Sequence, residues 1–356
     1  MIVATVSAVA GPSVSALLRI SAYATTRWTD PVTVSTESAN TPTLAHRVGG
    51  EIAGYDACMT SQPNRNEDPT TQYGHPDTEA EDQISHPGVT AEMNEEPDHG
   101  ESSYQGTGKL MGKRAIVTGG DSGIGRAVAI AFAREGADVA IAYLESEEED
   151  AQRTVQLVKD CGRRAVAVPG DLSEEAQCQT LIGSTLEAFR GIDILVNNAA
   201  YQMAQPGGID EITTAQFDRT LKTNLYAMFW LSKMALPYMQ AGATIINTSS
   251  IQATHPSPQL LDYAMTKAAI VNFTKGLAGM VAAKGIRVNT VAPGPIWTPL
   301  IPSTMPDEMT ASFGEDTPLG RAGQPAELAP AYVFFASAES SFITGEVLAV
   351  TGGSPF

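Results

Sequence analysis

The stretch that decides the fold of this chain reads Arg114-Ala115-Ile116-Val117-Thr118-Gly119-Gly120-Asp121-Ser122-Gly123-Ile124-Gly125. A short apolar run rich in β-branched residues leads into a glycine-dense turn, and apolar side chains then recur at helical spacing through Phe132. This order predicts a strand, a tight loop and a helix. In such a loop Gly119 permits the turn, Gly123 lets a phosphate approach the backbone, and Gly125 lets the helix pack on the strand.

The start of the predicted helix is suited to an anion. Its free N–H groups and the helix dipole would face the pyrophosphate of a dinucleotide. The glycines are spaced G-x-x-x-G-x-G, whereas the commoner nucleotide fingerprint is G-x-G-x-x-G. An ordinary βα turn can have the same composition, so the rest of the chain has to decide between the two interpretations.

Charge narrows the choice of partners. The 356 residues carry a net charge of −18, which argues against a nucleic-acid partner because phosphate binding needs a basic face. Residues 1–108 hold 4 Lys+Arg and 15 Asp+Glu, and residues 109–356 hold 18 and 25. Cys58, Cys161 and Cys178 show neither pairing nor metal-ligand spacing, which predicts a cytoplasmic protein without a metal site.

The first 108 residues differ from the rest of the chain. Residues 1–58 begin with an apolar run that Gly11 and Pro12 interrupt, too short and broken to span a membrane. We interpret this segment as an appendage, with Met59 as an alternative start; export is the other interpretation, since residues 22–24 mimic a cleavage site. Residues 59–108 are polar and acidic, which predicts a leader that is disordered or extends along another surface.

From residue 109 onward, strand and helix patterns alternate. We predict strands near 114–118, 138–143, 165–168, 192–197, 243–248, 286–292 and 346–350, and helices near 124–135, 148–161, 174–190, 214–240, 262–283 and 325–337. Apolar strands such as Ile192 to Val196 are typical of strands buried on both faces. The pattern predicts an α/β fold: a doubly wound parallel sheet (Rossmann fold) that forms a single domain over residues 109–356.

Polar signatures follow the ends of successive predicted strands. They are Asp171-Leu172, Asn197-Asn198-Ala199-Ala200, Asn247-Thr248-Ser249-Ser250 and Pro293-Gly294-Pro295, with Asn224 between them. Tyr263 and Lys267 are four residues apart and therefore share one helix face. A phenol is a poor acid–base catalyst at neutral pH, and a neighbouring ammonium would lower its pKa toward the working range.

With its glycine loop, its Asn-Asn-Ala run and its Ser, Tyr and Lys in this order, the chain resembles the short-chain dehydrogenase/reductase family over roughly residues 110–353. The resemblance implies that Tyr263 is the general acid–base and that Ser250 hydrogen-bonds the reacting oxygen. It also implies that Lys267 holds the nicotinamide ribose and that Asn224 completes a proton relay. Ser249 is the alternative to Ser250, but the thirteen-residue gap to the tyrosine favours Ser250.

The same resemblance implies a cofactor site made of Gly119, Asp121, Ser122, Gly123, Ile124, Gly125, Asp171, Leu172, Asn198, Ala199, Ala200, Tyr263, Lys267, Pro293, Gly294 and Ile296. The polar leader is similar to that of aldehyde reductases and of glucose/ribitol dehydrogenase homologues. Ala200 stands where the family usually has glycine, and Thr254-His255 stands where this branch often has a tyrosine. We expect His255 at the pocket rim, and Trp297 with the loop 298–316 over the substrate.

These features favour an NAD(P)-dependent oxidoreductase that interconverts a carbonyl and an alcohol, with a small molecule as substrate. The alternatives are a dinucleotide-binding stress or scaffold protein with little turnover, and enoyl reduction or sugar dehydration on a related fold. The resemblance also implies a homodimer or homotetramer through the helices 214–240 and 262–283.

The acidic run that starts at Glu145 should repel a 2′-phosphate and bind a free 2′-hydroxyl, which favours NAD over NADP. Arg126 is the base that would reverse this preference if its side chain swung back toward the phosphate.

Overall fold

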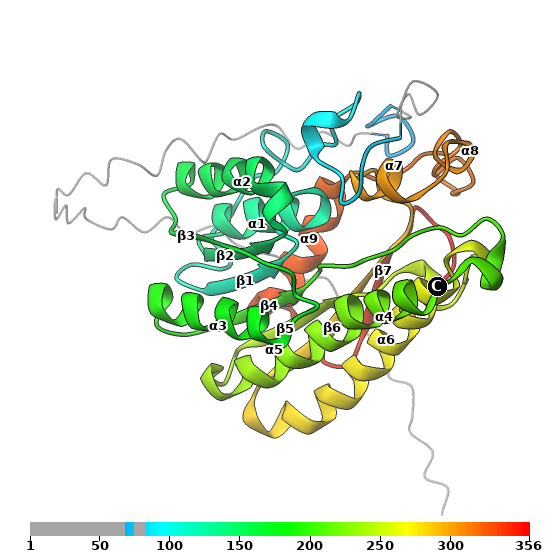
Figure 1. Ribbon diagram of the computed structural model, residues 1–356. Coiled ribbons are helices and arrows are strands. Elements are labelled where there is room, and N and C mark those ends of the chain that lie inside the picture. Colours follow the sequence, from blue (N-terminus) through cyan, green and yellow to red (C-terminus); the bar gives the residue numbers. More distant parts are fainter. Residues whose placement is uncertain (1–67, 75–82) are drawn as a thin grey trace, which may run out of the picture. The chain divides into compact units, whose positions relative to one another are not determined.

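The seven predicted strands form one parallel sheet (Figure 1). The computed structural model describes residues 68–74 and 83–356, which all belong to a unit spanning Ile52–Phe356. The predicted appendage 1–58 and the alternative start at Met59 lie outside the described residues. Among the described residues, no helix is long and apolar enough to cross a membrane.

The sheet has the strand order β3-β2-β1-β4-β5-β6-β7. The strands are β1 (Arg114–Thr118), β2 (Asp138–Tyr143), β3 (Ala165–Pro169), β4 (Ile194–Asn197), β5 (Thr244–Thr248), β6 (Arg287–Pro293) and β7 (Val347–Val350). In the register, Ile116 on β1 lies between Ala140 on β2 and Leu195 on β4. The order reverses between β1 and β4, and in such sheets ligands bind at the carboxyl ends of the strands beside this reversal.

Helices cover both faces of the sheet (Figure 1). One face carries α1 (Gly123–Arg134), α2 (Glu148–Asp160) and α9 (Pro325–Ala336), and the other carries α3 (Glu175–Phe189), α5 (Ala227–Ala235) and α6 (Leu261–Val281). Side chains of β1 alternate between the two cores, because Val117 packs with α1 and α9 whereas Ile116 packs with α3 and α5. The prediction of a doubly wound α/β fold is confirmed.

The prediction of one helix over 214–240 is wrong. Helix α4 (Thr214–Leu221) passes into a π-helical turn at Lys222–Tyr226 before α5, and a 3-10 turn at Leu236–Tyr238 follows α5. A π turn widens the helix by one residue and hardly alters the spacing of apolar side chains, so periodicity does not reveal it. The turn contains the predicted relay residue Asn224.

The described part of the leader lies along the domain (blue to cyan in Figure 1). The backbone N–H of Ile84 donates to Pro302 in the short helix α7 (Leu300–Thr304), 3.3 Å away. Further along the leader, the N–H of Ala326 at the start of α9 donates to the carbonyl of Asp98 at 2.9 Å. Met93 is buried with Ile84, so two apolar side chains and backbone hydrogen bonds order this polar segment.

Candidate active site

A cavity of about 790 Å³ lies at the carboxyl ends of the central strands, where the strand order reverses. It is lined by all the residues predicted to hold the cofactor except Gly125. Of the four predicted catalytic residues, Ser250, Tyr263 and Lys267 line it, whereas Asn224 lies behind it. Predicted site residues that lie between Gly119 and Ile296 in the sequence therefore converge on one cavity.

The glycine loop opens this cavity to a phosphate. Gly119 and Gly123 have φ angles of +59° and +48°, a conformation that favours glycine. A Cβ on Gly125 would lie 1.7 Å from the carbonyl oxygen of Gly119, so Gly125 serves close packing of α1 on the loop. Ser122 precedes α1 without a side-chain cap, which leaves the first N–H groups of the helix facing the loop. The loop thus fits the pyrophosphate of a dinucleotide.

Tyr263, Ser250 and Lys267 form one buried cluster. Tyr263 hydrogen-bonds the side chain of Ser250, which follows the end of β5. The Lys267 ammonium, one turn along α6, lies 5.1 Å from the centroid of the Tyr263 ring and donates to the carbonyl of Thr248 at 3.0 Å. Ser249 turns away, because its hydroxyl donates to the Lys267 carbonyl at 2.8 Å. Ser250, rather than Ser249, is therefore the serine beside the tyrosine.

The expected lowering of the tyrosine pKa is absent from the cluster. Burial raises the pKa of Tyr263 to about 12, although the hydrogen bond from Ser250 opposes the rise. Burial also lowers the pKa of Lys267 to about 7, because the ammonium is fully buried and the described residues offer it no carboxylate partner. Without a full positive charge beside it, the phenol keeps its proton.

Asn224 braces the wall of the cavity. Its amide oxygen accepts from the backbone N–H of Tyr201 at 2.7 Å, and its amide nitrogen donates to the Tyr201 carbonyl at 2.9 Å and to the Thr266 hydroxyl at 3.0 Å. Thr118, the last residue of β1, also holds the backbone after β4, because its hydroxyl accepts hydrogen bonds from the N–H groups of Asn198 and Ala199. These two residues fix the segment that follows β4. Sequence reasoning missed Thr118.

The chain is similar to known proteins over most of its length. A family profile described as "Enoyl-(Acyl carrier protein) reductase" matches residues 119–354, which is more than half of the chain. The chain belongs to the short-chain dehydrogenase/reductase family. Members of this family are NAD(P)-dependent oxidoreductases.

Two curated relatives match nearly their whole length. "Uncharacterized oxidoreductase YghA" of Escherichia coli (strain K12) is 54% identical over 287 residues, 80% of this chain and 97% of the relative. "NADPH-dependent aldehyde reductase 1, chloroplastic" of Arabidopsis thaliana is 46% identical over 283 residues, 78% of this chain and 98% of the relative. Both matches are longer than residues 109–356, so they include part of the leader.

Solved structures cover a smaller share of the chain. A short-chain dehydrogenase from Burkholderia cenocepacia J2315 in complex with NADP has a TM-score of 0.65 and 36% identity, and the match covers 69% of this chain and 98% of that chain. Residues 109–356 alone make up about the same fraction of this chain as the matched part.

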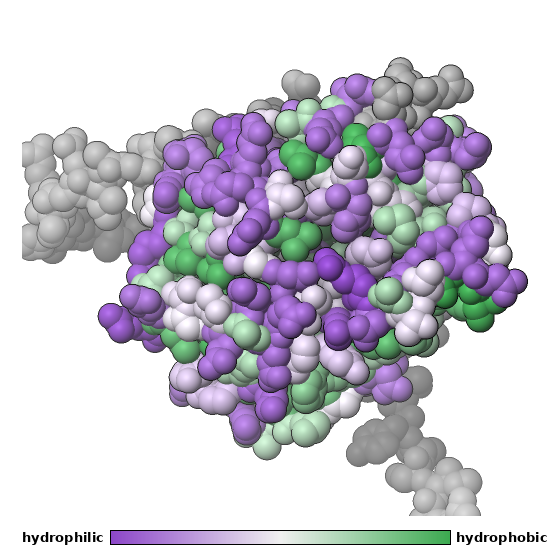
Figure 2. Space-filling view, viewed as in Figure 1, coloured by the Kyte–Doolittle hydropathy of each residue, from purple (hydrophilic) through white to green (hydrophobic). Residues whose placement is uncertain are grey.

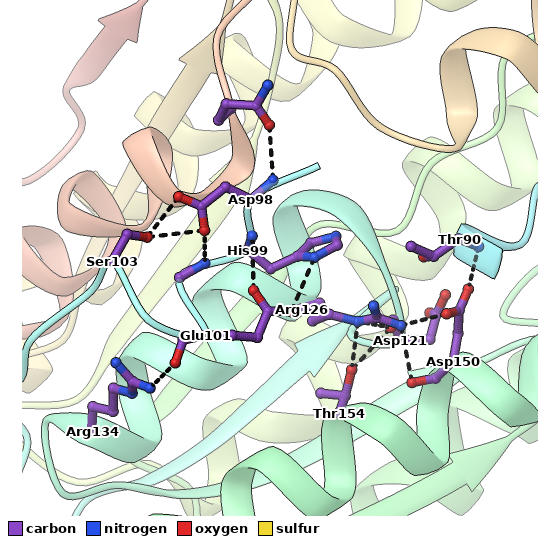
Figure 3. Close-up of polar contacts among 12 residues, drawn as sticks. Thr90, Asp98, His99, Glu101, Ser103, Asp121, Arg126, Arg134, Asp150 and Thr154 are labelled. Atoms are coloured by element: carbon purple, nitrogen blue, oxygen red, sulfur yellow. Dashed lines mark hydrogen bonds and ion pairs between the residues drawn. The ribbon is translucent and has the colours of Figure 1, made fainter. Parts of the chain in front are cut away.

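Glu145 and Arg126, the two residues expected to influence the choice between NAD and NADP, both lie outside the cavity. Glu145 is exposed and does not line the cavity, whereas Glu147 is buried in its wall. Arg126 does not face the cavity either, because its guanidinium bonds the Asp121 carbonyl, Thr154 and the Asp150 carboxylate (Figure 3). Burial raises the pKa of both Asp121 and Glu147, and the charge of Asp121 adds to the rise at Glu147.

The substrate end is built from three segments. Trp297 does not cover the substrate as predicted: it is fully buried beneath Tyr263, and its indole donates to the carbonyl of Glu95 in the leader. The loop 298–316 does line the cavity, and His255 lies exposed at its rim, both as predicted. The third segment is His86 and Pro87 of the leader, which sequence reasoning missed.

No site for a metal is evident in the part of the chain that the structure describes: no group of three His, Cys, Asp or Glu residues is arranged to hold one.

Proposed function

We propose that this protein interconverts a carbonyl group and an alcohol of a small substrate by hydride transfer, with Tyr263 as the general acid–base. The observation that carries the proposal is the buried Ser250–Tyr263–Lys267 cluster inside the cavity that the glycine loop opens. A scaffold that only bound a dinucleotide would have no chemical use for a buried phenol hydrogen-bonded to a serine beside a buried lysine.

The nicotinamide cofactor supplies or accepts the hydride when bound. Ser250 hydrogen-bonds the substrate oxygen, and the Tyr263 hydroxyl donates its proton to that oxygen during reduction or takes it during oxidation. Lys267 binds the nicotinamide ribose, and its protonated form stabilises the phenolate that Tyr263 becomes. Asn224 contributes by holding Tyr201 and the segment after β4, so we assign its side chain a positioning part in the proposed relay.

Small, uncharged substrates suit the cavity best. Glu308, Glu315 and Asp316 line its mouth, and the whole chain carries a net charge of −18. Acyl carrier proteins are acidic, so these carboxylates would repel a carrier-bound thioester at close range. Neutral polar groups around the cavity, including Gln252 and Ser257, favour hydroxyl-bearing aldehydes and polyols.

We also propose that NAD is preferred over NADP. A 2′-phosphate at the adenosine ribose would be buried beside Asp121 and Glu147, two carboxyl groups whose raised pKa values already reflect the cost of burying negative charge. Glu147, rather than Glu145, is the residue that would accept a hydrogen bond from a free 2′-hydroxyl. Arg126 cannot offset the phosphate charge while its guanidinium is held by Asp150 and the Asp121 carbonyl.

The exposed faces of α4 to α6 support a homodimer or homotetramer. Phe217, Tyr226, Phe229, Leu261 and Met265 are each about 40–50% exposed there. Figure 2 shows pale green and white side chains interspersed with purple ones over the lower part of the molecule, where Figure 1 places α5 and α6. Apolar side chains of this size on neighbouring helices are typical of a surface that a second copy covers.

A screen of the purified full chain tests the proposed function. Aldehydes, ketones, polyols and carrier-bound thioesters are offered with NADH, NADPH or the oxidised cofactors, and absorbance of the reduced cofactor is followed. We expect turnover of small hydroxyaldehydes and no turnover of carrier-bound thioesters. Cofactor binding without turnover of any compound would contradict the proposal and favour the scaffold alternative.

A further inference from the structure

The leader forms part of the substrate-side core. Ile84 and Met93 belong to the same apolar cluster as Tyr263, Trp297 and Ile301. The segment is tied to α7, because the Ser303 hydroxyl donates to the Pro87 carbonyl at 3.2 Å and a Cβ on Gly88 would lie 2.6 Å from the Pro299 carbonyl oxygen. This close packing holds the residues between Ile84 and Gly88 at one place on the cavity wall.

His86 lies at the centre of this segment and lines the cavity. Its ring meets the Tyr201 ring edge-on, with 5.2 Å between the centroids and 71° between the planes. Tyr201 is itself fixed by the two hydrogen bonds to Asn224. Among the described residues the imidazole of His86 makes no hydrogen bond, so its two ring nitrogens are available to a molecule in the cavity.

The imidazole is uncharged at neutral pH. Burial, together with the positive charge of Arg219, lowers the pKa of His86. Arg219 is in turn paired with Asp171 at 3.0 Å and lies over the Tyr201 ring, with 5.6 Å from its guanidinium carbon to the ring centroid. Arg219, paired with Asp171, is the charged residue whose field acts on His86. A neutral imidazole both donates and accepts, which suits a hydroxyl group better than a carboxylate.

We propose that His86 of the leader is a specificity-determining residue, which forms a wall of the substrate pocket and hydrogen-bonds a hydroxyl group of the substrate away from the reacting carbonyl. This inference rests on the proposed carbonyl–alcohol chemistry and adds to it a residue outside the Rossmann domain. The matched Burkholderia structure corresponds in length to residues 109–356, whereas the matches to the E. coli and Arabidopsis relatives extend into the leader. The leader then supplies a wall that the Rossmann domain alone lacks.

The test compares two aldehydes that differ in distal hydroxyl groups, D-glyceraldehyde and propanal, with the full-length chain. We expect His86→Ala to lower kcat/KM for glyceraldehyde by about tenfold, the loss of one good hydrogen bond, and to change kcat/KM for propanal less than about twofold. His86→Gln, which keeps a donor and an acceptor, should recover most of the loss. Glu96→Ala, at an exposed leader position, is the matched control and should change neither value.

Equal losses for both aldehydes in His86→Ala would overturn the proposal, since they would mean that the ring only packs against Tyr201. A binding measurement distinguishes failure of this inference from failure of the proposed function. Calorimetry gives the Kd of each aldehyde for two variants loaded with NAD⁺, Tyr263→Phe and Tyr263→Phe/His86→Ala. If the wild type turns over no compound of the screen described above, the carbonyl chemistry is wrong. A tenfold weaker Kd for glyceraldehyde alone would still support the role of His86, and identical or undetectable binding in both variants would refute it.

Discussion

Replacing Met93 by alanine should destabilise the protein as a core substitution does, although Met93 lies in the polar leader. The side chain is 6% exposed and packs in the cluster that contains Tyr263 and Trp297. Truncating a buried methionine to alanine removes its transfer free energy and leaves a cavity, which together cost about 2–5 kcal/mol in the free energy of unfolding. At roughly 2–4 °C per kcal/mol, the Tm should fall by about 4–20 °C.

Urea unfolding followed by circular dichroism, with calorimetry for the Tm, measures this effect. Met111→Ala is the matched control, because Met111 is 51% exposed and the same atoms are removed. We expect the control to lose less than half as much stability. The cluster also supports Tyr263, so Met93→Ala should lower kcat at temperatures where the variant is still folded. A loss within about 0.5 kcal/mol, as at an exposed site, would refute the view that the leader belongs to the core of this domain.

Three further predictions concern charge and assembly. Without ligand, Lys267 loses its proton near pH 7 in the folded protein, whereas in the unfolded chain it keeps the proton up to about pH 10.4. Between these two pH values, the free energy of unfolding should therefore rise with pH in the wild type relative to Lys267→Met. Parallel pH profiles of the two proteins in urea titrations would contradict this. At pH 9, above the raised Glu147 pKa of about 8, the carboxylate is ionised, and Glu147→Gln should then raise the ratio of kcat/KM for NADPH to that for NADH by about tenfold, the scale of one close like-charge contact. An unchanged ratio at that pH would exclude Glu147 as the selecting residue. Phe229→Glu should yield monomers by light scattering where the wild type is a dimer or tetramer, and a monomeric wild type would reject the proposed interface.

Local sequence patterns were enough to predict most of the fold. The glycine loop and the apolar strands are local features, so β1 and β2 begin and end at the predicted residues. The π turn at Lys222–Tyr226 escaped because one extra residue hardly changes helical periodicity. The leader escaped because its few apolar side chains, such as Met93, are buried only once α7 and Trp297 are placed beside them.

The candidate site was predicted in part for the same reason. Ser250, Tyr263 and Lys267 could be placed together because strand ends and helix faces determine where they lie. The pKa of Tyr263 could not be predicted, since it depends on how deeply both it and Lys267 are buried. The same holds for Glu147, which is buried and lines the cavity although Glu145, two residues earlier, is exposed.

The most direct test of the central claim is the turnover of Tyr263→Phe. This change removes the hydroxyl that hydrogen-bonds Ser250 and leaves the buried ring in place. We predict that kcat for the best aldehyde from the screen falls by about 10² or more, the usual scale of general acid–base catalysis, while the Kd of the reduced cofactor, measured by fluorescence, stays within about twofold. A phenylalanine variant with near-normal kcat would contradict the assignment of Tyr263 as the acid–base.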